Sequence, residues 1–455
     1  MSKKYLMSDV QKRLFITEQI QGLNTAYNMP AIFEVTGRIE AAKLLDALYQ
    51  MTEHHDILRT KFAYEGERYV QIIQDCVAID YEVTTQFTSI EEEYHQFMRP
   101  FDLEKDCLFR FKILLGKSSS IIMTDFHHII FDGVSTSLFF EELSNLYAGE
   151  QGSRSQVQYI HYSSWKKNLD LSKQEHYWIN VLSEVSHTLD LPYDFPRKSI
   201  RSYKGAYVIE TLDLEMMQAL KALCATHGTT AYVVMLSALS ILLHDYSHQG
   251  DFTIGTITAG RNHPQLEHLI GMFVNTLVMA CEVNKDDTVE QHLIKMKEVV
   301  FLAFENQDYP FERLVEKFGH GDPSRNPLFD VMFVFQNLET TTLNLGEMTL
   351  SPIEIEDNIA KFDSTLMISE TNAGYELSWE YRTDLFAEQT IKQTLKHYKN
   401  ILQGMLHDLS QKVGELNVLS TQEQKTIVDI FNKTKQLFPR GCGRKIKKGI
   451  STTNK

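Results

Sequence analysis

The sequence predicts a mixed α/β protein built from two domains. The 455 residues exceed what one hydrophobic core usually organises, so two domains of roughly 200 residues each are expected. Stretches that read as strands are interleaved with stretches of helical periodicity along the whole chain. A hydrophobic content of 43% and a charged content of 23% are typical of a globular protein with sizeable cores.

The first half alternates between the two kinds of element. Ser8 is a suitable N-cap for a short amphipathic helix, and Gly149 is a suitable end for the last helix of this half. The predicted helices span residues 8–21, 39–52, 90–98 and 134–147, and strands are predicted at 31–35, within 54–62, and at 68–73, 109–115 and 121–126.

The second half repeats this mixed pattern. We place the domain boundary between residues 165 and 189, where a helix at 174–182 containing Trp178 is expected to bridge the halves. Residues 1–175 then form the first domain, 176–425 the second, and 426–455 a linker remnant or disordered basic tail. The predicted strands are 206–212, 252–258, 328–335, 365–370 and 375–381, and the predicted helices are 215–227, 230–246, 289–305 and 387–406.

Composition excludes several classes of protein. A net charge of −15 argues against general nucleic-acid binding, and the basic run is confined to the last residues. No apolar run is long enough to span a membrane, and the N-terminus lacks a signal-peptide core, so a cytoplasmic protein is expected. We also expect a monomer. The cysteines are scattered and odd in number, without CxxC spacing, which favours a reduced compartment. The histidines show no HExxH spacing, so no metal site is expected.

The stretch DFHHIIFDGVS at residues 125–135 is the strongest site candidate. Two adjacent histidines end a predicted strand, and Asp132 and Gly133 precede a predicted helix. Histidine is the side chain best suited to moving a proton at neutral pH. The alternative is that one histidine is a satisfied core residue and Asp-Gly only a turn. The connection from strand to helix favours a site, because free N–H groups at a helix start can hold a polarised oxygen.

This stretch and six others resemble, in order, the seven motifs of the condensation domains of nonribosomal peptide synthetases. The HHxxxDG signature is His127 to Gly133, and the resemblance extends over about residues 8–419. The other motifs lie at residues 8–15, 54–62, 159–165, 270–276, 306–312 and 322–328.

The resemblance implies two domains like chloramphenicol acetyltransferase, arranged as a V with the active site in a tunnel between them. The implied reaction is amide-bond formation, in which an acceptor amine attacks a donor thioester. Both substrates arrive on phosphopantetheine arms of an upstream donor and a downstream acceptor peptidyl carrier protein, and no cofactor is bound covalently. An adenylation domain or other synthetase modules are the further partners. The seventh motif looks most like the subtype that joins an L-donor to an L-acceptor.

The resemblance also implies roles for single residues. His128 is the central residue, either as the base that takes the amine proton or as the group that orients the amine. His127 shapes the tunnel. Gly133 lets substrate pass close, with its N–H facing the developing oxyanion, and Ser135 adds a hydroxyl there. Asn275 is either a tunnel residue or an ordinary loop-forming asparagine near a strand.

Asp132 is expected to be structural. The family generally shows an arginine that pairs with this aspartate and pins the loop. Arg261 is the first candidate partner in this chain and Arg59 the second. Arg59 could alternatively be a solvated residue beside a strand.

Two departures from the family pattern stand out. An arginine that commonly follows the fifth motif is replaced here by the run VMAC at residues 278–281, and the fourth motif contains Ser163 and Ser164 where larger residues are usual. The chain contains no Gly-Gly pair and so no carrier attachment site. Carriers must therefore act in trans, or the sequence is a fragment of a synthetase.

Two other functions stay open. One is a coenzyme A-dependent acyltransferase of the same superfamily, acting on a free amine or alcohol. The other is a non-catalytic platform that recruits carriers, against which the intact HHxxxDG signature argues.

Overall fold

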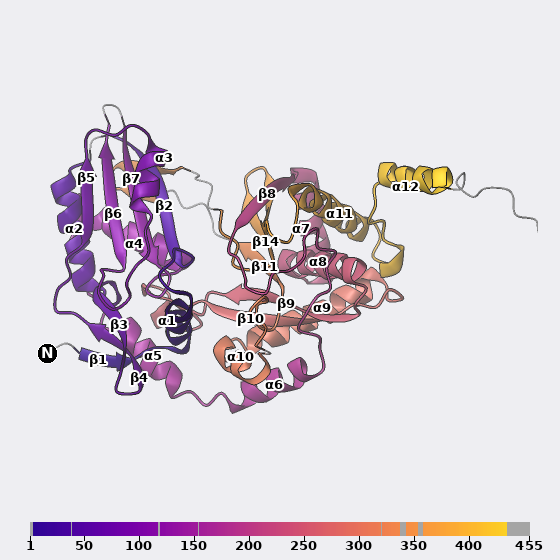
Figure 1. Cartoon of the computed structure of the whole chain (residues 1–455), viewed down its shortest axis with the longest axis horizontal. Helices are drawn as coiled ribbons and strands as arrows, with labels where there is room; N and C mark the ends of the chain where they lie inside the picture. Colours follow the sequence, from indigo (N-terminus) through magenta and orange to yellow (C-terminus); the bar gives the residue numbers. More distant parts are fainter. Residues whose placement is uncertain are drawn as a thin grey trace, which may run out of the picture.

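The computed structural model describes residues 3–37, 39–116, 119–152, 154–319, 321–336, 343–353 and 358–434. These residues form two lobes that diverge as a V, and a six-stranded sheet lies in each lobe (Figure 1). The predicted mixed α/β fold is confirmed. The basic residues after 434, including Arg440, Arg444 and Lys445, lie outside the described residues.

The first lobe is built on the sheet β12-β13-β2-β7-β6-β5, with a three-stranded sheet β1-β4-β3 beside it. Helix α4 packs on one face of the larger sheet, where Phe140 meets Phe33 with ring centroids 5.0 Å apart. Helix α3 covers the other face through Tyr94 and Phe97. The first lobe contains, in sequence order, the strands β1 (Lys3–Leu6), β2 (Asn28–Thr36), β3 (Thr60–Glu65), β4 (Arg68–Ile73), β5 (Asp80–Thr84), β6 (Phe109–Leu115) and β7 (Ser119–His127). Its helices are α1 (Asp9–Gln21), α2 (Ala41–His54), the 3₁₀ turn η1 (Asp56–Arg59), α3 (Ile90–Phe97), α4 (Gly133–Ala148) and α5 (Tyr159–Lys167).

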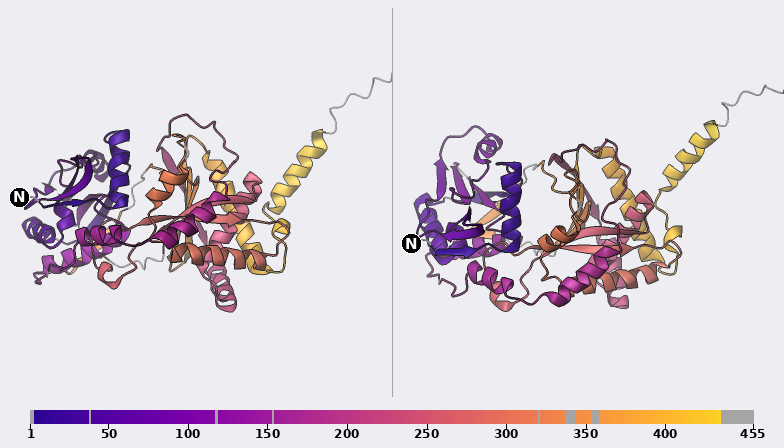
Figure 2. Two further views of the ribbon diagram at one scale, coloured as in Figure 1. Left: turned by 90° about the horizontal axis from the view of Figure 1, so that it is seen from below. Right: turned by 60° about the horizontal axis from the view of Figure 1, so that its bottom comes forward.

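The second lobe is built on the sheet β10-β9-β11-β14-β15-β8. Helix α8 is buried along most of its length, and the hydroxyl of Tyr398 on α11 donates to the carbonyl of Met235 on α8 at 3.0 Å. The strands are β8 (Gly205–Leu212), β9 (Asp251–Thr258), β10 (Asn275–Glu282), β11 (Val331–Gln336), β14 (Ser364–Thr371) and β15 (Gly374–Arg382). The helices are α6 (Ser172–Ser183), α7 (Leu214–His227), α8 (Ala231–Ser247), η2 (Pro264–Leu266), α9 (Val289–Glu305), α10 (Phe311–Phe318), α11 (Glu388–His407), η3 (Val413–Glu415) and α12 (Thr421–Thr434). Helix α12 projects away from this lobe (Figure 2).

Two segments of the second half belong spatially to the first lobe. Strands β12 (Leu343–Leu345) and β13 (Met348–Pro352) extend the first sheet, with Leu350 of β13 opposite Val35 of β2. The loop at residues 259–274, between β9 and β10, places Ile270 and Phe273 in the core of the first lobe. The expected division into contiguous domains at residues 175 and 176 is therefore corrected, because the chain crosses between the lobes more than once.

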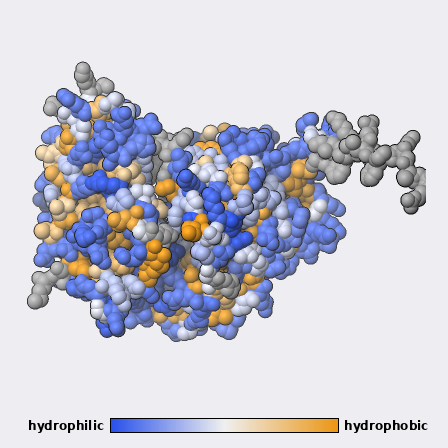
Figure 3. All heavy atoms as spheres, viewed as in Figure 1, coloured by the Kyte–Doolittle hydropathy of each residue, from blue (hydrophilic) through white to orange (hydrophobic). Residues whose placement is uncertain are grey.

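The surface on the face shown in Figure 3 is mainly hydrophilic, with hydrophobic side chains interspersed over both lobes. Within the described residues, no single helix is long and apolar enough to cross a membrane. Helices α7 and α8 meet the criteria of length and composition only as a pair bent by 105°.

Candidate active site

The HHxxxDG segment joins the end of β7 to the start of α4. In the sheet, β7 lies between two neighbouring strands, β2 and β6. The backbone N–H of His127 donates to the carbonyl of Leu108 before β6, and that of His128 donates to the carbonyl of Tyr27 before β2. After a short turn, Asp132 caps α4 by accepting the N–H of Ser135 at 2.9 Å. The two histidines are therefore fixed by the sheet, and the helix start is fixed by the aspartate.

His127 is fully buried and turned away from solvent. Its Nδ1 accepts the N–H of Ile129 at 3.1 Å, so Nε2 carries the proton and donates to Oε1 of Glu18 at 2.7 Å. The ring edge faces Phe101 at a centroid distance of 6.0 Å. These contacts make His127 a fixed part of the wall behind the turn. Glu18, on α1, was not predicted from the sequence, although it lies close to the first motif.

His128 points the other way, as expected for the next residue after a strand. Its Nδ1–H donates to the carbonyl of Phe131 at 2.7 Å, which leaves the lone pair of Nε2 available. Burial lowers the pKa of His128 to about 4, and the nearby charge of Lys361 lowers it further in the same direction. The imidazole is thus neutral at physiological pH and can accept a hydrogen bond through Nε2.

Asp132 is completely buried, and it connects the first lobe to the loop that arrives from the second lobe. Its Oδ2 accepts from Nη1 of Arg261 at 2.8 Å and from the N–H of Phe273 at 3.1 Å, and its Oδ1 accepts from Nη2 of Arg261 at 3.0 Å. The guanidinium also lies over the ring of Phe273, 4.3 Å from its centroid. The predicted ion pair with Arg261 is confirmed.

The alternative prediction, that Arg59 pairs with Asp132, is wrong. Arg59 forms an ion pair with Asp56 and donates to the carbonyls of Thr52 at 2.9 Å and Gln74 at 2.7 Å. It lies at the end of a 3₁₀ turn, so its guanidinium folds back on its own segment. Arg59 therefore supports the connection between α2 and β3.

Ser135 also departs from expectation. Its hydroxyl is completely buried, with Oγ 2.8 Å from Oδ1 of Asp132 and 3.0 Å from the carbonyl of Gly271. The same oxygen accepts from the N–H of Gly271 at 3.1 Å and from Nη2 of Arg261 at 3.1 Å. Because these contacts engage it fully, the prediction that Ser135 adds a hydroxyl to the tunnel is corrected: it joins α4 to the crossing loop.

Gly133 has open space around its Cα, whereas Asn275 is held by several hydrogen bonds. A Cβ added at Gly133 would meet no heavy atom within 4 Å, so packing in this structure does not require glycine there. Asn275 begins β10 and donates through Nδ2 to the carbonyls of Gln307 and Tyr309, both at 2.8 Å. It also accepts the N–H of Phe311 at 3.3 Å. The asparagine therefore ties the fifth motif to the sixth.

A cavity at the junction of the lobes contains His128 on its wall. Its empty volume is about 1140 Å³, counting space open to solvent. The described lining comes from α1, β9 to β11, α10 and the segments around residues 201 and 361, and it contains no aspartate or glutamate. The lining residues are Arg13, Leu14, Thr17, Tyr27, His128, Arg201, Tyr203, Ile257, Met272, Val274, Thr276, Phe311, Val315, Asn326, Pro327, Phe329, Met332, Lys361 and Phe362.

Comparison with known proteins identifies the group to which this arrangement belongs. The condensation domain family matches residues 1–428. The chain belongs to the condensation domain family. The activity of this family in nonribosomal peptide synthetases is amide-bond formation, a form of acyl transfer.

Curated relatives of this condensation domain are much longer proteins. Bacitracin synthase 3 of Bacillus licheniformis is 36% identical over 96% of the chain, and tyrocidine synthase 2 of Brevibacillus parabrevis is 35% identical over 94%. The chain spans only 7% and 12% of these two proteins. The structure of a four-domain nonribosomal peptide synthetase bound to AMP and glycine superposes with a TM-score of 0.85 at 22% identity. That superposition covers 93% of this chain and 34% of the larger one.

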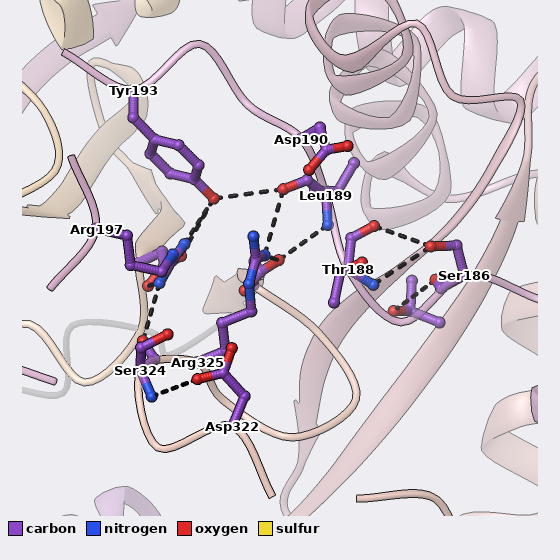
Figure 4. A network of polar contacts seen from close by, with 12 residues as sticks. Ser186, Thr188, Leu189, Asp190, Tyr193, Arg197, Asp322, Ser324 and Arg325 are labelled. Carbon is purple, nitrogen blue, oxygen red and sulfur yellow. Dashed lines mark hydrogen bonds and ion pairs between the residues drawn. The ribbon is translucent and has the colours of Figure 1, made fainter. Parts of the chain in front are cut away.

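The remaining motifs of the condensation domain hold the lobes together or shape the cavity. In the first motif, Nε of Arg13 lies 3.1 Å from Oε1 of Glu312 in the sixth, which links α1 to α10. In the seventh motif, the carbonyl of Ser324 accepts from Nη1 of Arg197 at 2.9 Å (Figure 4). Arg325 of the same motif pairs with the buried Asp330 at 2.5 Å. These contacts hold the turn that presents Asn326 to the cavity.

Sequence reasoning also missed the cations of the cavity wall. Arg201 and Lys361 lie outside the seven motifs, and no local pattern marks them as cavity residues. Within the described residues, no group of three or more His, Cys, Asp or Glu side chains is placed to hold a metal ion.

Proposed function

We propose that this condensation domain joins a donor acyl thioester to the amine of an acceptor aminoacyl thioester, each carried on a phosphopantetheine arm. The observation that carries the proposal is the neutral His128, whose Nε2 is available in a cavity lined by both lobes. A reaction between two tethered substrates needs a site that both can reach, and the cavity at the junction of the lobes is such a site. The carriers and an adenylation domain would be neighbours in a longer synthetase.

We propose that His128 chiefly orients the attacking amine. An imidazole with a pKa of about 4 is a weak base, so it holds little of the amine proton before the carbon–nitrogen bond forms. Accepting an amine N–H at Nε2 instead aims the nitrogen lone pair at the thioester carbonyl. Fixing two reactants in this way can supply effective molarities of about 10⁵ to 10⁸ M. The tetrahedral intermediate then collapses, the carbon–sulfur bond breaks, and the proton of the attacking nitrogen passes to the departing sulfur, which leaves as a thiol.

The start of α4 is proposed to stabilise the developing oxyanion. The first N–H groups of a helix, among them that of Gly133, have no partner within the helix and carry partial positive charge. We further propose the subtype that condenses an L-donor with an L-acceptor, on the basis of the SRNPL sequence at residues 324–328.

The test incubates the protein with separately loaded donor and acceptor carriers and measures dipeptidyl carrier by mass spectrometry. We expect product with the wild-type protein and a decrease of about 10²- to 10⁴-fold with His128→Ala, leaving weak residual turnover. A matched control is His95→Ala, which removes an exposed histidine from α3. Unchanged turnover in His128→Ala would remove His128 from the mechanism.

The rival functions give different results in the same assay. A coenzyme A-dependent acyltransferase would acylate a free amine from an acyl-coenzyme A and ignore the loaded carriers. A non-catalytic platform would bind the carriers and give no product with any pair. Donors of D and L configuration in parallel reactions test the subtype, and a preference for the D-donor would contradict it.

A further inference from the structure

The cavity around His128 carries an unusual balance of charge. Among the described residues, its wall includes Arg13, Arg201 and Lys361 and no carboxylate. Arg13 is offset by Glu312, which lies behind the wall at 3.1 Å. Because His128 is neutral and Arg201 donates to no carboxylate among the described residues, the guanidinium of Arg201 brings positive charge to the cavity. In a partly enclosed site such charge is poorly screened by water and attracts anions.

The two remaining cations lie close to the reacting centre. Lys361 stands over the ring of Tyr27 with Nζ 5.5 Å from the ring centroid, and the carbonyl of Tyr27 accepts the N–H of His128 at 2.8 Å. The charge of Arg201 also acts on Tyr27, lowering the pKa of that phenol against the larger effect of burial, which raises it. Arg201 and Lys361 therefore flank a residue bonded directly to the active-site histidine.

Arg201 retains donor capacity within this wall. Its Nη1 donates to Oδ1 of Asn326, which is an uncharged acceptor, and the guanidinium lies 5.0 Å from the ring centroid of Tyr203. Its Nε has no hydrogen-bond partner among the described residues.

Among the described residues, the carboxylate whose charge acts on Arg201 is that of Asp363, and it is bound by two other arginines. Asp363 binds Arg197 and Arg382, each with an Nη1 to Oδ1 distance of 3.1 Å. A guanidinium with an unbonded Nε, in a cavity whose described lining carries no acid, is suited to a planar, doubly accepting anion.

We propose that Arg201 is a specificity-determining residue that recognises a carboxylate on one of the two joined amino acids, so that the condensation domain prefers an aspartyl or glutamyl substrate over its amide. This inference rests on the proposed function and names a substrate class for the same site. The other source of an anionic group is the phosphate of a carrier arm. That phosphate lies at the far end of the arm from the thioester, whereas Arg201 and Lys361 line the same cavity as the histidine.

The test is a competition between substrates that differ only in charge. Carriers are loaded with Glu or Gln, and with Asp or Asn, from the corresponding aminoacyl-coenzyme A thioesters, first as donor and then as acceptor. Equal amounts of the acid and the amide compete for the wild-type protein, and mass spectrometry gives the product ratio. We expect the acid to be favoured by about 10-fold or more in one of the two positions, the factor typical of a hydrogen bond between charged groups.

Substitutions of Arg201 test whether its side chain causes the preference for the acidic substrate. Arg201→Gln is expected to bring the ratio to within about 2-fold of unity, and Arg201→Lys to retain part of it. Lys198→Gln is the matched control, because it removes the same charge from an exposed residue outside the cavity and should keep the wild-type ratio. The wild-type ratio alone keeps the proposal falsifiable if a variant fails to fold.

Three outcomes are decisive. A wild-type ratio near unity in both positions overturns the inference, while the dipeptides themselves still support the proposed condensation. An equal loss of acidic and amide products in Arg201→Gln also overturns it and assigns the guanidinium to the arm phosphate. Absence of every product, with neutral substrates as well, contradicts the proposed function itself.

Discussion

At the scale of single residues, the two adjacent histidines carry their protons on opposite nitrogens. His127 is protonated at Nε2 because its Nδ1 accepts a backbone N–H, and His128 is protonated at Nδ1 because that atom donates to the carbonyl of Phe131. Successive side chains of an extended segment point to opposite sides, so one ring enters the core and the other faces the cavity. The same residue type is thus used once for support and once for contact with substrate.

The lowered pKa of His128 predicts a distinctive titration. The folded-state value of about 4 lies below the ordinary 6.5, so the ring stays neutral until the pH falls toward 4. In the unfolded chain the same ring takes a proton near pH 6.5, so this group reduces the free energy of unfolding as the pH falls from 6.5 to 4. We expect the Cε1–H NMR signal of His128, assigned with His128→Ala, to stay constant from pH 8 to 5.5. A His128 midpoint near 6.5 would contradict the burial argument.

The ion pair and helix cap formed by Asp132 predict a large loss of stability when this residue is replaced. Asp132→Ala leaves the buried Arg261 without its counter-charge and removes the cap of α4. Breaking a buried ion pair in this way typically costs about 3–5 kcal/mol. Urea unfolding followed by circular dichroism measures the change. The control is Asp80→Ala, which breaks an exposed pair with Arg99 and should cost less than about 1 kcal/mol.

At the scale of elements, the loop between β9 and β10 assembles the site. It leaves the second lobe at Thr258, buries Ile270 and Phe273 in the first lobe, and returns at Asn275 to start β10. Along this path it delivers Arg261 to Asp132 and the backbone of Gly271 to Ser135. The loop is therefore the structural reason why motifs separated by more than 100 residues meet.

Packing at Gly271 predicts which change disrupts the loop. A Cβ at this position would lie 2.2 Å from Cδ2 of Tyr159, whose hydroxyl donates to the carbonyl of Met272 at 2.6 Å. Gly271→Ala should therefore displace the loop and lower the free energy of unfolding by about 1–3 kcal/mol. Gly250→Ala is the control, because its Cβ would have its nearest neighbour at an ordinary 3.8 Å. Equal stability of the two variants would show that the loop accommodates the methyl group.

Local patterns predicted many elements, and distant contacts account for what was missed. The apolar spacing of the helices at 230–246 and 387–406 was sufficient, because each presents a continuous face to its core. The strand expected within 54–62 begins only at Thr60, since Asp56 to Arg59 form a 3₁₀ turn held by Arg59. Asp132 could be assigned a supporting role from its place just after a strand and from the arginine partner that the family resemblance implies. The involvement of Glu18, Arg201 and Lys361 depends on segments that only the tertiary fold brings together.

At the scale of the whole molecule, the two lobes are interlocked. Strand β13 pairs with β2 of the first sheet, and the loop at 259–274 fills part of the same core. Ion pairs between α1 and α10, such as Asp9 with Arg313 at 3.3 Å, add contacts across the seam. Contacts of this kind cannot be read from sequence, because each partner looks like an ordinary member of its own half.

This interlocking predicts that the first half cannot fold alone. A fragment of residues 1–175 lacks β13, so the edge of β2 is left without its partner strand, and it lacks Ile270 and Phe273 from its core. An unpaired edge and an unfilled core favour aggregation over a stable fold. We expect the fragment to show no cooperative thermal transition by circular dichroism, and co-expression with residues 176–434 to yield a soluble complex. A cooperative transition in the isolated fragment would contradict this, because it would mean that the crossing segments are attached to a lobe already complete. If only the complex folds, the cavity at the junction forms as a consequence of folding, and His128 reaches its working geometry only when both halves are present.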